Sequence, residues 1–114
     1  MAYTKRFCYS CDLKDNPDLI TKYKAYHSSG NAWPEITKSI KDAGIVDMQI
    51  YLTGNRMFMI MEVDDTFNPE TKAEMDKNNP KVQEWETLMD TFQQRLPWAK
   101  KGEKWVEMER IFKL

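Results

Sequence analysis

The sequence is short of the residue types that most metal and covalent chemistry requires. It has one histidine, two cysteines and four glycines among 114 residues. It contains no glycine-rich phosphate loop, no nucleophile motif and no run of metal ligands. Basic and acidic side chains are nearly balanced, 17 against 18, so no excess of charge points to nucleic acid or to an anionic membrane. We therefore expect a protein without a metal or other cofactor and without a nucleic-acid partner.

Long apolar segments are also missing. The N-terminus lacks the apolar run of a signal peptide, and no segment approaches the roughly 20 residues that span a bilayer. A cytoplasmic protein without membrane contact is the expectation. The length suits one domain over residues 1–114, since domains usually hold about 100–150 residues.

The two cysteines form a CxxC motif, Cys8 and Cys11. A redox CxxC usually lies at the start of a helix. A zinc site needs two further ligands, and His27 is the only histidine that could be one of them. Here the pair lies within an alternating stretch that predicts a strand, so the two thiols point to opposite faces. We expect two reduced cysteines packed in or near a sheet.

The spacing of apolar residues predicts an α+β domain. Strands are expected over 5–13, 45–52, 56–63 and 104–113, and helices from Pro17 to His27, from Trp33 to Ala43, within 64–77 and over 80–96. The order is β-α-β-β-α-β with each helical region broken in two. This order is typical of a ferredoxin-like sandwich, in which helices cover one face of an antiparallel sheet, as in dimeric α+β barrels.

The second face of that sheet is expected to be apolar. It would carry five large side chains, Tyr51, Phe58, Ile60, Trp105 and Ile111. Because exposed apolar patches of this kind mark contact surfaces, the pattern predicts a homodimer that forms through this face.

The only histidine lies in the segment "YKAYHSSGNAWPEI". Tyr23 and His27 are four residues apart on a predicted helix, so they project from one face. Met48 and Trp85 are expected to face the same gap between helices and sheet. An aromatic pocket with one phenol and one imidazole suits a carbohydrate, and imidazole can transfer a proton near neutral pH. From the pattern alone, a lone histidine such as His27 is more often a surface or structural residue, and Trp33 more often packs at a helix start.

Five segments together carry a family resemblance. "YKAYH" with "WPEI", then "GIVDMQIYL", "VQEWETLM" and "MERIF", resemble the L-rhamnose mutarotase family over nearly the whole chain. The resemblance implies a dimeric ferredoxin-like enzyme, an isomerase that interconverts the α and β anomers of a 6-deoxy pyranose. It implies that His27 is the proton donor and that Tyr23 is a sugar-binding phenol.

The sequence departs from the family's motif at two positions. The family's strand tyrosine falls at Met48, and its tryptophan pair becomes Trp85-Glu86. Losing a hydroxyl and an aromatic face while gaining a carboxylate should change which sugar hydroxyls are recognised, so L-fucose is an alternative to L-rhamnose. We suggest Glu86 as the complementary base or a hydroxyl ligand. Trp33 and Tyr51 complete the set of expected substrate-binding residues.

Two other functions remain open at this stage. Small dimeric α+β barrels include monooxygenases and haem-binding proteins, in which a lone histidine such as His27 would be an axial ligand. A non-catalytic sugar-binding dimer is the other alternative.

Overall fold

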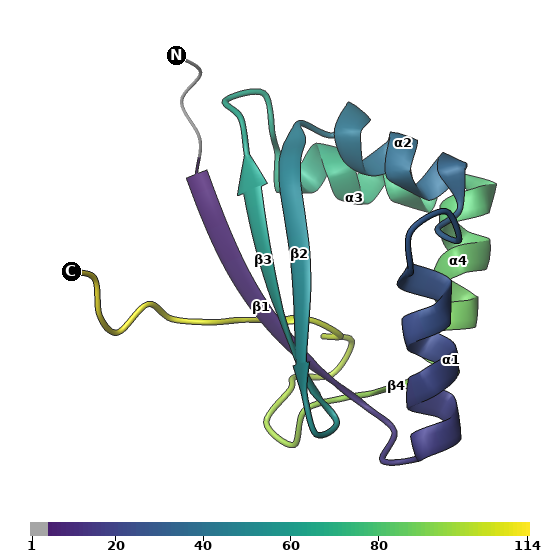
Figure 1. The fold of residues 1–114 in the computed structure, drawn as a ribbon. Helices are drawn as coiled ribbons and strands as arrows, with labels where there is room; N and C mark the ends of the chain where they lie inside the picture. Colours follow the sequence, from purple (N-terminus) through teal and green to yellow (C-terminus); the bar gives the residue numbers. More distant parts are fainter. Residues whose placement is uncertain (1–4) are drawn as a thin grey trace.

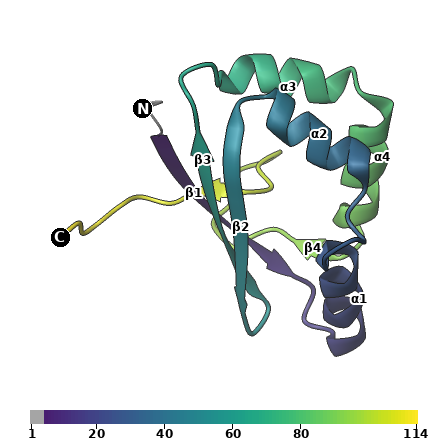
Figure 2. The same ribbon diagram turned by 45° about the horizontal axis from the view of Figure 1, so that its top comes forward.

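The computed structural model describes residues 5–114, which form an antiparallel sheet with all helices on one side (Figures 1 and 2). The strands are β1 (Lys5–Leu13), β2 (Ile45–Thr53), β3 (Arg56–Val63), β4 (Gln93–Gln94) and β5 (Val106–Glu107). The helices are α1 (Pro17–His27), α2 (Pro34–Asp42), α3 (Pro69–Lys77) and α4 (Pro80–Asp90). Among these helices none is both long and apolar enough to cross a membrane.

The strand order is β2-β3-β1-β4, and β5 also pairs with β1. The fourth strand of the predicted sandwich therefore exists as two short pieces, β4 and β5, on the outer edge of β1. β2 forms the opposite edge of the sheet. The ferredoxin-like α+β fold expected from the order of elements is confirmed.

Three of the four helices begin at an Asn-Pro pair. Asn16, Asn68 and Asn79 each accept hydrogen bonds from two backbone amides of the first turn, and proline follows where no intrahelical donor is required. α2 is the exception, since Trp33 precedes Pro34 and provides no side-chain cap. The side chain of Trp33 therefore does not cap α2.

The register of the strands separates a helix-facing side of the sheet from an outer face. Cys11 pairs with Met57, and Met48 pairs with Met61, so these side chains share the helix-facing side. The core is built there, and its buried members are Cys11, Leu13, Tyr23, Met57, Met89 and Phe92 in one cluster and Ile45, Met61 and Val63 in a second.

The two cysteines lie on opposite faces, as their spacing predicts. Cys8 is partly exposed, Cys11 is fully buried, and both are free thiols. Burial raises the pKa of Cys11 to about 11, which keeps that thiol protonated and unreactive.

Two predicted boundaries are wrong. The helix expected over 80–96 ends at Asp90, because the chain then turns to bury Phe92 and to pair Gln93 with Leu13 of β1. The strand expected over 104–113 forms only at Val106–Glu107, since the last described bond to β1 runs from Met108 N to Cys8 O at 2.7 Å. The remaining segment, 109–114, leaves the sheet (Figure 1).

The predicted outer-face set is also corrected at Trp105. This side chain packs against the helix-side cluster that contains Cys11 and Leu13. The register explains this, because the pairs Tyr9–Glu107 and Ser10–Val106 put Trp105 on the same face of the sheet as Cys11. Tyr51, Phe58 and Ile60 do lie on the outer face.

Candidate active site

The last two turns of α1 bring Tyr23 and His27 together. Their positions one turn apart place both rings on one helix face, and the ring centroids stack 4.3 Å apart. Tyr23 is only 5% exposed and contacts Phe92 edge-on at 6.0 Å, so the core holds the phenol ring in place. His27 is the last helical residue and stays accessible at the surface end of this stack.

A hydrogen bond determines which nitrogen of His27 carries the proton. The Nδ1 atom lies 2.8 Å from the backbone oxygen of Tyr23. A carbonyl oxygen only accepts, so in the neutral ring Nδ1 must donate and Nε2 must carry the lone pair. Resting His27 therefore presents a proton acceptor to a bound molecule.

The surroundings of His27 favour this neutral form. Burial of the ring lowers the pKa of His27 from its ordinary 6.5, against the opposing effect of the hydrogen bond to Tyr23. Because its pKa is lowered from 6.5, the His27 imidazole is mostly unprotonated at neutral pH and becomes charged as the pH falls through that lowered value.

Tryptophans extend the aromatic surface around the imidazole. Trp85 of α4 contacts His27 edge-on at 5.5 Å, and Trp33 contacts Trp85 at 5.0 Å. Tyr26 meets the far side of Trp85 at 6.1 Å. The structure thus brings Tyr23, His27, Trp33 and Trp85 into one cluster.

A pocket of about 440 Å³ opens beside His27, between the end of α1, α2 and the edge strand β2. This volume suits a monosaccharide, since small-molecule sites typically begin near 300 Å³. Met48 lines it, as expected from the sequence. The full lining is His27, Thr37, Ile40, Lys41, Ile45, Val46, Asp47, Met48 and Ile50.

Sequence reasoning missed the α2 wall of this pocket. Thr37 and Lys41 are one helical turn apart on either side of Ile40, which packs on the second core cluster. Their spacing was visible in the sequence and signals one shared face. The sequence does not show that this face lies opposite β2, because that depends on the path of the chain through Gly44 between the two elements.

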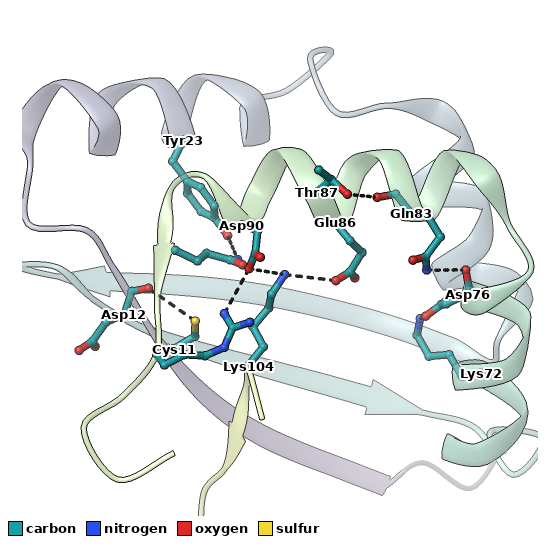
Figure 3. Close-up of polar contacts among 12 residues, drawn as sticks. Cys11, Asp12, Tyr23, Lys72, Asp76, Gln83, Glu86, Thr87, Asp90 and Lys104 are labelled. Carbon is teal, nitrogen blue, oxygen red and sulfur yellow. Dashed lines mark hydrogen bonds and ion pairs between the residues drawn. The ribbon is translucent and has the colours of Figure 1, made fainter. Parts of the chain in front are cut away.

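Two expected binding residues lie elsewhere. Glu86 points to Lys104, whose Nζ is 3.2 Å from the Glu86 carboxylate and 3.5 Å from Asp90 (Figure 3). Tyr51 lies on the outer face, 56% exposed, with its hydroxyl donating to Gln49 at 2.6 Å. Neither side chain lies in the lining of the His27 pocket. That lining also excludes Tyr23, Trp33 and Trp85, so His27 and Met48 are the two expected site residues that line it.

Fold and site together define a small α+β sandwich with a sugar-sized pocket beside an aromatic cluster and one imidazole. The family model described as L-rhamnose mutarotase matches residues 6–114. The chain belongs to the L-rhamnose mutarotase family. It is accordingly an enzyme, an isomerase that acts as a sugar mutarotase, and the comparisons give no support to the haem-binding, monooxygenase and non-catalytic alternatives.

Two individual relatives and one solved structure are also similar to the chain. The chain is 42% identical over 110 residues to an L-fucose mutarotase from Xanthomonas campestris pv. campestris, covering 96% of this chain and 88% of that protein. It is 34% identical over 116 residues to a UPF0734 protein of Dictyostelium discoideum, covering 96% of this chain and 90% of the relative. The crystal structure of an L-rhamnose mutarotase from Formosa agariphila matches the fold with a TM-score of 0.68 at 22% identity, covering 96% of this chain and 98% of the other.

Proposed function

We propose that this mutarotase interconverts the α and β anomers of a 6-deoxy-L-hexose in the pocket beside His27, with L-fucose preferred over L-rhamnose. The preference is supported by the 42% identical relative that is an L-fucose mutarotase. It is also supported by Met48, which lines the pocket at the position of the family's strand tyrosine and offers no hydroxyl to the sugar.

The observation that carries the mechanism is the bond between His27 Nδ1 and the Tyr23 carbonyl. With Nε2 unprotonated, His27 takes the proton from the anomeric hydroxyl as the bond between C1 and the ring oxygen breaks. The imidazolium then gives a proton to the ring oxygen, which yields the open aldehyde. Rotation about the C1–C2 bond and the reverse steps close the ring on the other face of the aldehyde. His27 is thus the proton donor that the family resemblance implies, but it begins as a base.

The proposed function is tested by saturation-transfer NMR on the anomeric protons of L-fucose and L-rhamnose. The protein is expected to accelerate exchange of both sugars above the rate in buffer, with a higher kcat/KM for L-fucose. Exchange of neither sugar would sink the assignment to 6-deoxy-L-hexoses, and a preference for L-rhamnose would reverse the order of the two substrates.

The pH profile follows from the lowered pKa of His27. Because the neutral ring is the starting form, kcat/KM is expected to be flat above pH 7 and to fall as the pH drops through the lowered pKa. Even at the ordinary value of 6.5, roughly three quarters of the imidazole would be neutral at pH 7. A His27 that starts as the acid would give the opposite profile, with activity lost on the alkaline side.

Glu86 remains our candidate for a secondary contact with the sugar. The proposal is supported by the raised pKa of Tyr23, to which burial contributes most and the charge of Glu86 contributes in the same direction. For Glu86→Gln we expect a change in KM or in sugar preference of about fivefold, the size of one modest polar interaction. Unchanged rate and unchanged preference would remove Glu86 from the site.

We also propose that the protein works as a homodimer in the cytoplasm and that the outer face is the contact surface. Support comes from the exposed apolar side chains there, among them Tyr51 at 56%, and from those of the C-terminal segment, Ile111 at 89% and Phe112 at 75%. A groove of about 1080 Å³ separates this segment from β1 and β3. Light scattering is expected to give twice the chain mass of 13.6 kDa for the wild type and a monomer for Phe112→Asp. A monomeric wild type at micromolar concentration would contradict the proposal.

A further inference from the structure

Two buried polar side chains, Tyr23 and Gln93, keep hydrogen-bonding groups that no other side chain uses within the described residues. Gln93 of β4 is 6% exposed, and its Nε2 atom lies 3.2 Å from the hydroxyl of Tyr23. The Tyr23 side chain extends from α1 toward the sheet to reach this point (Figure 3). An amide NH₂ only donates, so the phenol oxygen is the acceptor in this bond.

Three hydrogen-bonding capacities are left over in this arrangement. The Gln93 amide has two N–H donors, and the bond to Tyr23 uses only one of them. The Oε1 atom of Gln93 is buried and has no partner within the described part of the chain. Across residues 5–114, the Tyr23 hydroxyl donates to no acceptor either. Burial raises the pKa of Tyr23 to about 12, so the phenol keeps its proton at neutral pH. Two donors and one acceptor therefore lie side by side.

One hydroxyl group satisfies all three, because a hydroxyl donates one hydrogen bond and can accept two. Turning the Gln93 amide over does not alter the count. The phenol would then donate to Oε1, and the NH₂ group and the phenol oxygen would be left as two donors and one acceptor. Buried polar groups are costly when unpaired, so a feature of this kind needs a partner.

We propose that Gln93 and the Tyr23 phenol together bind one ring hydroxyl of the sugar, which makes Gln93 a specificity-determining residue. The inference rests on the proposed function and deepens it. Since Tyr23 lies on the inner side of His27, the bound hydroxyl is not the anomeric one. Gln93 Oε1 is closed off from solvent, so the sugar reaches it after a shift of the partly buried aromatic side chains against this cluster, Tyr26, Trp85 and Trp105.

The test measures KM and kcat of wild type and Gln93→Met by saturation-transfer NMR. The substrates are L-fucose and its 2-deoxy, 3-deoxy and 4-deoxy derivatives. Gln93→Met keeps the approximate size of the side chain and removes both polar ends. We expect about a tenfold higher KM for L-fucose with a smaller change in kcat. For the one derivative that lacks the bound hydroxyl, wild type and variant should have the same KM.

The neighbouring Gln94 provides the matched control, since it is exposed and its side chain lies on the other face of the strand. Gln94→Met should leave KM unchanged for every sugar. If Gln93→Met does not fold, Tyr23→Phe removes the phenol hydroxyl from the same pair and should show the same pattern across the deoxy sugars.

Two results would overturn the inference while leaving the proposed function intact. One is an unchanged KM with a lowered Tm, which would mean that the pair holds a water molecule or serves packing alone. The other is an equal loss for L-fucose and every deoxy derivative, which would mean that Gln93 acts on the fold. A wild type that exchanges none of the sugars defeats the proposed function and this inference with it.

Discussion

Replacing His27 by alanine is expected to slow enzymatic anomer exchange by about 10²–10⁴-fold, the usual contribution of one positioned proton-transfer group. His27 is the only imidazole in the chain. The bond between its Nδ1 and the Tyr23 carbonyl leaves the lone pair on Nε2. No other side chain in the pocket lining is an imidazole, since the others are apolar, a hydroxyl, a lysine or an aspartate.

The comparison variant is Tyr26→Phe, one residue before His27 on the same helix. Tyr26 packs its ring against Trp85 and Phe92, and phenylalanine keeps that ring. Saturation-transfer NMR should find its exchange rate within about twofold of wild type, because the change removes only a hydroxyl from a partly buried ring whose packing is kept. Undiminished exchange in His27→Ala, with a normal circular dichroism spectrum, would remove the histidine from the mechanism.

Gly44→Ala is expected to cost about 2–4 kcal/mol of unfolding free energy, from backbone strain and overpacking together. Gly44 links α2 to β2 at φ +93°, a conformation that L side chains rarely adopt. A Cβ atom here would lie 2.7 Å from both Asp64 Oδ1 and Thr66 Oγ1, and 3.1 Å from the Phe67 amide nitrogen. The backbone on both sides is also tied, since Asp64 N donates to Gly44 O at 2.9 Å.

Gly30→Ala is the control that isolates the close contact. Gly30 has a similar φ of +84°, but a Cβ atom there would meet nothing within 4 Å. Urea denaturation should therefore give a loss of only about 1 kcal/mol for Gly30→Ala, the strain alone. Because Gly44 sets where α2 lies, its substitution should also raise KM by displacing the Thr37 and Lys41 wall. Equal losses for the two glycines would show that packing around Gly44 is unimportant.

The helix starts and the β2–β3 hairpin were predictable because local chemistry determines them. Asn16-Pro17 supplies a cap and a residue that needs no donor, and Gly54 takes the positive φ of +58° that the tight turn requires. The four-residue spacing of Tyr23 and His27 likewise guarantees that they share a helix face. For these features the interacting atoms are within a few residues of one another.

The end of α4 and the last strand were mispredicted for the opposite reason. Phe92 and Leu96 continue a helical spacing, yet they are buried by a chain that has already turned into β4. Ile111 and Phe112 alternate as a strand does, but within the described chain they have no neighbouring strand to pair with. Periodicity reports which side chains are apolar and not which surface will cover them.

The order of elements, the family and the one imidazole able to transfer a proton at neutral pH can be read from the chain, because each depends on residue identity and short spacing. The state and the surroundings of that imidazole depend instead on how the chain folds. The bond from His27 to the Tyr23 carbonyl makes the resting histidine a base, and residues of α2 form one wall of the pocket beside it. Glu86 forms an ion pair with Lys104, and Gln93, 70 residues further along the chain, donates a hydrogen bond to Tyr23. Proton position and hydrogen-bond partners depend on distances between segments remote in sequence, and folding alone sets those distances.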